Sequence, residues 1–113
     1  MRFVGRVPRA ELEGGRLVRL PYPPFDVMVT LVNGEPRAIE DACNHAGASL
    51  SEGDREGDDC VSCPMHGYVF EITTGRLLRP RGLCDDQRTF VARFEGDDVA
   101  VWDPGARLHI IGP

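Results

Sequence analysis

Lysine is absent from the sequence, so all 13 of its basic residues are arginines. Acidic residues outnumber them at 18, which leaves a net charge of −5. A chain of this charge, without a basic patch, repels the phosphate backbone of DNA and RNA. We therefore expect no nucleic-acid partner. The negative charge favours solubility and could steer a positively charged protein partner.

Long hydrophobic runs are also absent. Charged residues interrupt residues 1–8 every few positions, so this segment lacks the apolar core of a secretory signal. No other stretch approaches the length that spans a bilayer. We expect a cytoplasmic protein that is not bound to a membrane. In that reducing compartment, four cysteines point to metal or redox chemistry rather than to disulfides.

The length of 113 residues suits a single domain, which we take to span residues 1–113. Thirteen glycines and nine prolines separate short runs that are rich in Val, Phe and Leu. This punctuation is typical of an all-β sandwich or barrel. We expect strands at residues 3–7 and 16–20, with one helical turn at residues 8–12 that begins at Pro8.

Two β-hairpins are predicted from turn residues between alternating or apolar runs. They pair residues 27–32 with 37–40, and residues 89–95 with 99–102 around a turn at 96–98. The first hairpin turns at Asn33-Gly34, because both residues tolerate positive φ. In the second hairpin, Phe90, Ala92 and Phe94 recur with the period of two that a half-buried strand requires.

Cysteine and histidine gather in the middle of the chain, where Cys43-Asn-His45 and Cys63-Pro-Met-His66 are separated by 17 residues. Each motif pairs one soft thiolate with one imidazole, and Cys₂His₂ is also a zinc set. Zinc modules usually pair Cys with Cys and His with His along the chain, so the alternating order argues against mononuclear zinc. The pattern favours an iron–sulfur cluster with two Cys and two His ligands.

The similarity extends beyond these ligands. Cys43-Asn-His-Ala-Gly-Ala-Ser-Leu50, Cys63-Pro-Met-His-Gly-Tyr-Val-Phe70 and Thr74-Gly75 closely resemble the cluster loops of Rieske proteins. The resemblance implies a Rieske-like antiparallel β-sandwich with a small cluster-binding subdomain, whose loops span about residues 41–52 and 60–75. It also implies one [2Fe–2S] cluster per chain.

The resemblance assigns the ligands as well. Cys43 and Cys63 would hold a buried iron, and His45 and His66 an outer iron near solvent. The segment between the loops, residues 52–59, is acidic, and we expect it to be a solvated connection. A short match at residues 80–83 suggests a third, proline-containing loop beside the cluster.

Four positions depart from the respiratory and photosynthetic Rieske type. Ala48 and Met65 stand where those proteins carry a disulfide, and Tyr68 and Phe70 where they carry a Ser and a Tyr that bond to the cluster sulfurs. Without those hydroxyls, we expect a soluble ferredoxin near the bottom of the Rieske potential range of about −150 to +300 mV.

The resemblance and the motifs predict an electron carrier rather than an enzyme. It would pass single electrons from a reductase to a terminal oxygenase, and would bind no small-molecule substrate itself. A Rieske oxygenase needs a further iron held by two His and a carboxylate, and only His109 remains once His45 and His66 are used. A small subunit of a nitrite reductase and a redox sensor remain as alternatives.

Two cysteines and one histidine lie outside the predicted ligand set. Cys60 forms Cys60-x-x-Cys63, a spacing seen in redox motifs, but its expected place on the strand entering the second loop favours a buried small side chain. Cys84 is expected to be structural, and His109 to lie on the surface.

Overall fold

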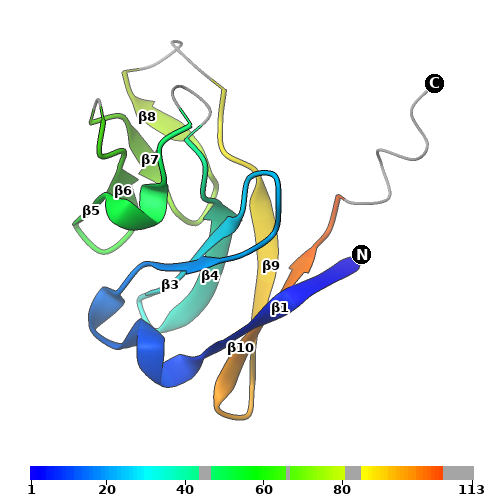
Figure 1. The fold of residues 1–113 in the computed structure, drawn as a ribbon. Coiled ribbons are helices and arrows are strands. Elements are labelled where there is room, and N and C mark those ends of the chain that lie inside the picture. Colours follow the sequence, from blue (N-terminus) through cyan, green and yellow to red (C-terminus); the bar gives the residue numbers. More distant parts are fainter. Residues whose placement is uncertain (44–46, 66, 81–84, 106–113) are drawn as a thin grey trace, which may run out of the picture.

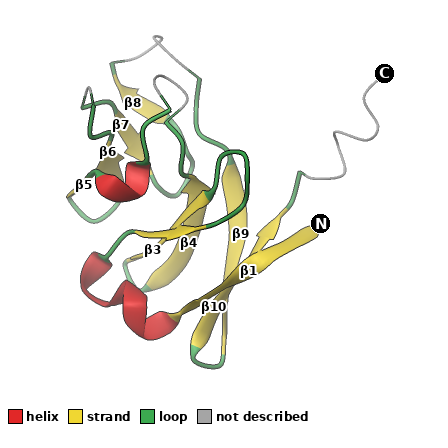
Figure 2. Cartoon of the chain, in the orientation of Figure 1, coloured by secondary structure: helices red, strands yellow, loops and turns green. Residues whose placement is uncertain are grey.

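A computed structural model describes residues 1–43, 47–65, 67–80 and 85–105. Within these ranges the protein has ten strands and two short 3-10 helices (Figures 1 and 2), and no helix is long and apolar enough to cross a membrane. The strands are β1 (Arg2–Pro8), β2 (Val18–Leu20), β3 (Val27–Val32), β4 (Glu35–Glu40), β5 (Asp54–Glu56), β6 (Cys60–Ser62), β7 (Val69–Glu71), β8 (Leu77–Arg79), β9 (Thr89–Glu95) and β10 (Asp98–Asp103); the helices are η1 (Arg9–Gly15) and η2 (Leu50–Glu52). The predicted all-β class is confirmed.

Six of the strands form one antiparallel sheet in the order β1-β10-β9-β4-β3-β2. Because β1 also contacts β2, the sheet curls until its two edge strands meet (Figure 1). We call it the curled sheet. It encloses a core that consists mainly of Val7, Leu12, Val27, Val29, Ala38, Phe90, Val99 and Val101.

The other four strands form a small antiparallel sheet in the order β5-β6-β7-β8, packed at one end of the curled sheet (Figure 1). Both sheets contribute to the core between them, which contains Met28, Val32, Ile39, Cys43, Leu50, Val61, Cys63, Phe70, Ile72 and Leu77. Strand β3 and the second half of β4 therefore have both faces covered. This explains why residues 27–32 are continuously apolar or buried instead of alternating. The predicted small second subdomain is confirmed.

Both predicted hairpins are present. Asn33 and Gly34 have φ values of 51° and 79°, as a tight turn between β3 and β4 requires. The second hairpin differs in its turn. Because Glu95 pairs with Asp98, the turn is the two-residue Gly96-Asp97 and not residues 96–98. The expected burial of alternate residues in β9 also fails at its end, where Phe94 is exposed under the guanidinium of Arg9, 4.1 Å from the ring centroid.

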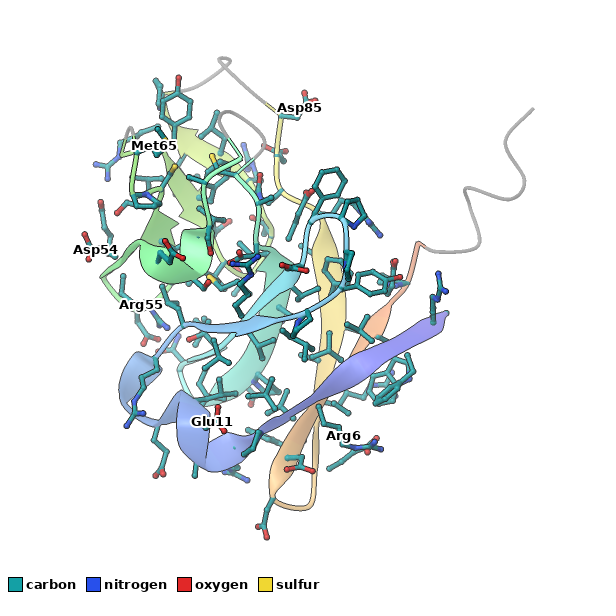
Figure 3. All side chains as sticks on the ribbon, viewed as in Figure 1. Arg6, Glu11, Asp54, Arg55, Met65 and Asp85 are labelled. Atoms are coloured by element: carbon teal, nitrogen blue, oxygen red, sulfur yellow. The ribbon has the colours of Figure 1, made fainter. Side chains whose placement is uncertain are left out.

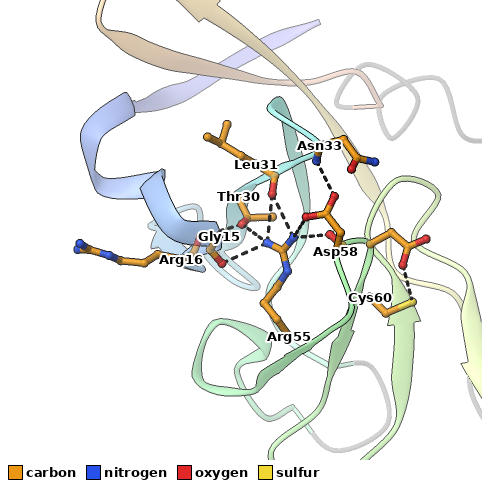
Figure 4. Close-up of polar contacts among 9 residues, drawn as sticks. Gly15, Arg16, Thr30, Leu31, Asn33, Arg55, Asp58 and Cys60 are labelled. Carbon is orange, nitrogen blue, oxygen red and sulfur yellow. Dashed lines mark hydrogen bonds and ion pairs between the residues drawn. The ribbon is translucent and has the colours of Figure 1, made fainter.

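The acidic segment at residues 52–59 is mostly exposed, as its composition predicts, but one of its side chains is turned inward. The segment contains β5, and the side chain of Arg55 is only 17% exposed. This guanidinium reaches from the small sheet to the curled sheet, where it donates hydrogen bonds to Thr30 Oγ1 (2.7 Å) and to the carbonyls of Gly15 (3.1 Å) and Leu31 (3.2 Å) (Figure 4). It also binds the carbonyl of Asp58.

Asp58 adds a second link between the two sheets. Its carboxylate accepts a hydrogen bond from the amide of Asn33, 2.7 Å away, at the turn between β3 and β4 (Figure 4). The segment between the two predicted cluster loops therefore docks the small sheet on the curled sheet. The acidic composition of the segment did not predict this docking role, because one arginine, Arg55, makes most of the contacts.

Replacing Arg55 by Met keeps the aliphatic stem and removes every donor. We expect Arg55→Met to lower the free energy of unfolding by about 2 kcal/mol, because hydrogen bonds of charged groups contribute roughly 1.5–3 kcal/mol. Urea unfolding followed by circular dichroism measures the change. Arg37→Met, at an exposed position of β4, is the matched control and should leave the midpoint unchanged. Equal midpoints for the two variants would contradict the docking role of Arg55.

Candidate metal centre

The two cysteines of the predicted ligand set lie at the junction of the two sheets. Cys43 follows β4 of the curled sheet, and Cys63 directly follows β6 of the small sheet. Neither forms a disulfide, they are exposed by 0% and 2%, and both belong to the core between the sheets. Their predicted partners, His45 and His66, lie outside the described residues.

The loop after Cys43 is closed by two backbone hydrogen bonds. The amide of Cys43 donates to the carbonyl of Ala48 (2.7 Å), and the amide of Gly47 donates to the carbonyl of Cys43 (2.6 Å). Gly47 has a φ of 73°, a conformation that favours glycine. The cysteine is therefore held at the start of a tight loop whose end returns beside it.

The loop after Cys63 repeats this arrangement. The amide of Cys63 donates to the carbonyl of Tyr68 (2.7 Å), and the amide of Gly67, at a φ of 69°, donates to the carbonyl of Cys63 (3.0 Å). Each bond joins residues with the same spacing as in the first loop. The same pair of backbone hydrogen bonds, which we call the backbone frame, thus surrounds each cysteine. The two loops differ in sequence and follow strands of different sheets.

A buried carboxylate fixes the base of the first loop. Asp41 accepts hydrogen bonds from the hydroxyl of Ser49 (2.6 Å) and the amide of Ser51 (2.8 Å), and its own carbonyl accepts from the amide of Leu50 (2.8 Å). Sequence reasoning missed Asp41. The available signal was the acidic residue two positions before Cys43, with two serines a few residues after the loop.

A buried amide fixes the same strand end from the other side. Gln87 is 3% exposed, and its Nε2 donates to the carbonyls of Glu40 (2.9 Å) and Ala42 (2.8 Å). These carbonyls come directly before the first cysteine, so Gln87 positions the chain where it enters the loop. Nothing in the sequence marked Gln87, because its partners are 47 and 45 residues away.

The described residues fit a metal group held partly by sulfur. Both thiols lie in one core and neither forms a disulfide, and cysteine sulfur is a ligand that iron–sulfur clusters prefer. No group of three or more potential ligands from His, Cys, Asp and Glu forms within the described ranges, which do not include His45 and His66. The structure thus brings the two cysteines of the predicted set into one core, and the ligand set as a whole remains a prediction.

The four departures from the respiratory type lie around these loops. Met65 is 61% exposed and Ala48 is partly buried. Neither residue has a thiol, so no disulfide joins the two loops at these positions. Phe70 is fully buried in the core between the sheets, and Tyr68 packs against that core while partly exposed. The backbone frames described above hold the loops in place of the disulfide.

Cys60 lies on β6, as predicted, but it is partly exposed rather than buried. Its Sγ lies 3.5 Å from Oδ1 of Asp59. Burial, together with the hydrogen bond and charge of Asp59, raises the pKa of the Cys60 thiol to about 11. A thiol of this pKa stays protonated at neutral pH, which makes Cys60 a poor metal ligand and a poor redox nucleophile.

The remaining predictions for this part of the chain cannot be placed. Cys84, His109 and residues 81–83 of the suggested third loop lie outside the described residues. Pro80, at the start of that loop, follows β8 directly.

The Rieske [2Fe-2S] domain family matches residues 7–84 of the chain. The match covers both cysteine loops, the whole small sheet and strands β2, β3 and β4 of the curled sheet. The protein therefore belongs to the Rieske [2Fe-2S] family, and as a member it binds one [2Fe–2S] cluster. This confirms the family and the cofactor that the two motifs predicted, and it excludes the mononuclear zinc alternative.

Proteins of similar sequence are ferredoxin components of dioxygenases. The chain is 41% identical over 91 residues to the ferredoxin component of biphenyl 2,3-dioxygenase from Rhodococcus jostii RHA1, covering 80% of this chain and 83% of that protein. It is 35% identical over 100 residues to the ferredoxin subunit of 3-phenylpropionate/cinnamic acid dioxygenase from Shigella boydii, covering 88% and 92%. Both relatives are named as the ferredoxin part of a dioxygenase.

Solved structures agree on the fold. The ferredoxin of carbazole 1,9a-dioxygenase from Nocardioides aromaticivorans IC177 superposes with a TM-score of 0.79 at 22% identity, over 90% of this chain and 98% of that one. A chain in the complex of reduced oxygenase and oxidized ferredoxin of carbazole 1,9a-dioxygenase superposes with a TM-score of 0.80 at 25% identity, over 89% and 93%. The predicted Rieske-like architecture is confirmed.

The individual ligands stay a prediction. We expect alanine at Cys43, His45, Cys63 or His66 to abolish the cluster, because each substitution removes one of four protein ligands. Alanine at Cys60 or Cys84 should leave the cluster in place. Iron and sulfide analysis, together with visible absorption, distinguishes the six variants. A cluster retained in His45→Ala but lost in Cys60→Ala would contradict the assignment.

Proposed function

We propose that the protein is a one-electron carrier, a Rieske ferredoxin that passes electrons from a reductase to a terminal oxygenase in the cytoplasm. The observation that carries this proposal is the 41% identity, over four-fifths of the chain, to a dioxygenase ferredoxin component. In this proposal residues 1–113 act as a single domain with no catalytic site of their own. The structural similarity to a ferredoxin from an oxygenase complex supports the oxygenase as one partner.

Cys43, His45, Cys63 and His66 are the ligands in this proposal. When bound, the cluster supplies a reversible one-electron couple. The chain provides a frame for it, because Asp41 holds the base of the first loop and paired backbone bonds hold both cysteines. Rigid ligands keep the geometry similar in both oxidation states, which favours fast electron exchange.

The exchange site in this proposal is the loop tip, residues 44–47 and 64–67. Met65 and Pro64 are exposed there, and Met65 lies far from Arg6 and Glu11 (Figure 3). Ala46 and the two histidines belong to the same tip by sequence. A small apolar surface suits an electron carrier, because such complexes bury less than about 1,200 Å² and must dissociate quickly.

A bulky charge at the tip tests this function. We expect Met65→Glu and Ala46→Glu to slow reduction by the cognate reductase and oxygenase turnover in the reconstituted system by about tenfold, because the charge must be desolvated on docking. The rates are measured by stopped-flow absorption and by product formation.

The control for this test is Asp97→Ser, at the exposed turn between β9 and β10 (Figure 1). It should behave as wild type, and all variants must first be shown to retain the cluster and its potential. Wild-type protein that cannot support oxygenase turnover would contradict the carrier function. Tip variants that react as fast as wild type would contradict only the exchange site.

The reduction potential of the cluster offers a separate test of whether the lack of hydroxyl donors at positions 68 and 70 matters. We expect a low potential, and expect Tyr68→Ser with Phe70→Tyr to raise it, because a hydroxyl donor near a cluster sulfur stabilises the reduced state. A net hydrogen bond of 0.5–1.5 kcal/mol corresponds to about 20–60 mV for a one-electron couple. Protein-film voltammetry measures both forms. A wild-type potential well into the positive range would show that hydroxyls at these positions do not set it.

A further inference from the structure

The loop between β2 and β3 has an unusual composition, Pro21-Tyr22-Pro23-Pro24-Phe25-Asp26, and a fixed shape. The amide of Asp26 donates to the carbonyl of Tyr22 (2.9 Å), and the amide of Tyr22 donates to the carboxylate of Asp26 (2.8 Å). Arg19 Nε donates to the same carboxylate (2.8 Å). These bonds close the loop on itself at both ends.

The same loop is tied to the first cysteine loop. The amide of Asp41 donates to the carbonyl of Asp26 (3.0 Å), and the amide of Ala42 donates to the carbonyl of Phe25 (3.1 Å). The backbone of Phe25 is thus held one residue away from Cys43, while its side chain is 51% exposed. A large aromatic ring kept in solvent by a rigid backbone is typical of a binding surface rather than of a core.

A groove of about 480 Å³ separates the two loops, and its lining includes Pro24, Phe25, Glu40, Ala42, Cys43 and Gly47. Its walls are mostly apolar, with a single carboxylate among these residues. Glu40 is only 9% exposed, and its carboxylate receives one long hydrogen bond among the described residues, from the amide of Arg88 at 3.4 Å. A carboxylate so deeply buried is costly unless a cation comes to it.

We propose that this groove receives a lysine or arginine side chain from the protein that exchanges electrons with this one. The aliphatic stem of that side chain packs on Pro24 and Phe25, its charge meets the carboxylate of Glu40, and the ring of Phe25 adds a cation–π contact. The proposal rests on the proposed carrier function and names a docking contact for it. Because Cys43 lines the same groove, the contact places the partner directly beside the first cluster loop.

The net negative charge of the chain favours a basic side chain of a partner protein in the groove over a second copy of this protein. With a net charge of −5, two copies repel each other, whereas a partner with a basic face is attracted. Most arginines near the groove are already engaged: Arg19 pairs with Asp26 (2.7 Å) and Arg88 with Asp103 (2.6 Å). Neither of these two guanidinium groups forms an ion pair with Glu40, so we assign the cation for Glu40 to the partner.

The test uses the holoprotein and cytochrome c, a lysine-rich haem protein that accepts single electrons. The variants are Glu40→Gln and Phe25→Ala, with Glu35→Gln at the exposed far end of β4 and Phe3→Ala, whose side chain is 46% exposed, as matched controls. Affinity is measured with redox-inactive zinc-substituted cytochrome c, and electron transfer with the iron form. Ferricyanide, a small anion, is the second oxidant and reports any change in driving force.

At low ionic strength we expect Glu40→Gln to weaken binding and slow transfer to cytochrome c about tenfold, because loss of one partner of a desolvated charge pair acts mainly on dissociation. Phe25→Ala should cost about threefold. The Glu40→Gln effect should shrink in high salt, whereas the Phe25→Ala effect should persist. The controls, and all rates with ferricyanide, should match wild type.

Two results would overturn the proposal while leaving the carrier function intact. In one, wild type and Glu40→Gln bind zinc-substituted cytochrome c equally well. In the other, Glu35→Gln weakens binding as much as Glu40→Gln, so that net charge and not the groove is responsible. A wild-type holoprotein that transfers no electron to either oxidant would instead contradict the carrier function itself.

Discussion

The site depends on one constraint, that two cysteines from different sheets must reach the same small volume. Cys43 follows a strand of the curled sheet and Cys63 a strand of the small sheet, so the relative position of the sheets sets the distance between the two thiols. A shared apolar core and the guanidinium of Arg55 fix that position. The matching backbone bonds of the two loops then orient each cysteine locally.

The local parts of this arrangement could be predicted from the sequence because their signals are local. Asn33-Gly34 specifies its turn by φ preference, and the Cys-x-His and Cys-x-x-His spacings specify the loops. What could not be predicted depends on distant partners. Arg55 contacts carbonyls 24 and 40 residues away, and Gln87 contacts others still further along the chain. The composition of residues 52–59 suggested solvent exposure, and only the packed structure shows Arg55 turned inward.

A buried negative charge and an exposed aromatic ring lie at the same end of the molecule. An acidic chain without lysine carries a nearly buried carboxylate, Glu40, in the groove beside the first cysteine loop, and an exposed ring, Phe25, lines the same groove. Both gain if a cationic, partly apolar surface docks there, which links the charge of the whole chain to the place where electrons would leave it.

The central claim is that two histidines and two cysteines hold the cluster, with both histidines on one iron. Electron–nuclear double resonance of the dithionite-reduced protein tests this most directly, because it detects nitrogen atoms bonded to the paramagnetic centre. The account predicts hyperfine couplings from two coordinated imidazole nitrogens, which disappear together with the cluster. A reduced cluster without coordinated nitrogen, or purified protein that holds zinc and gives no paramagnetic signal, would contradict it.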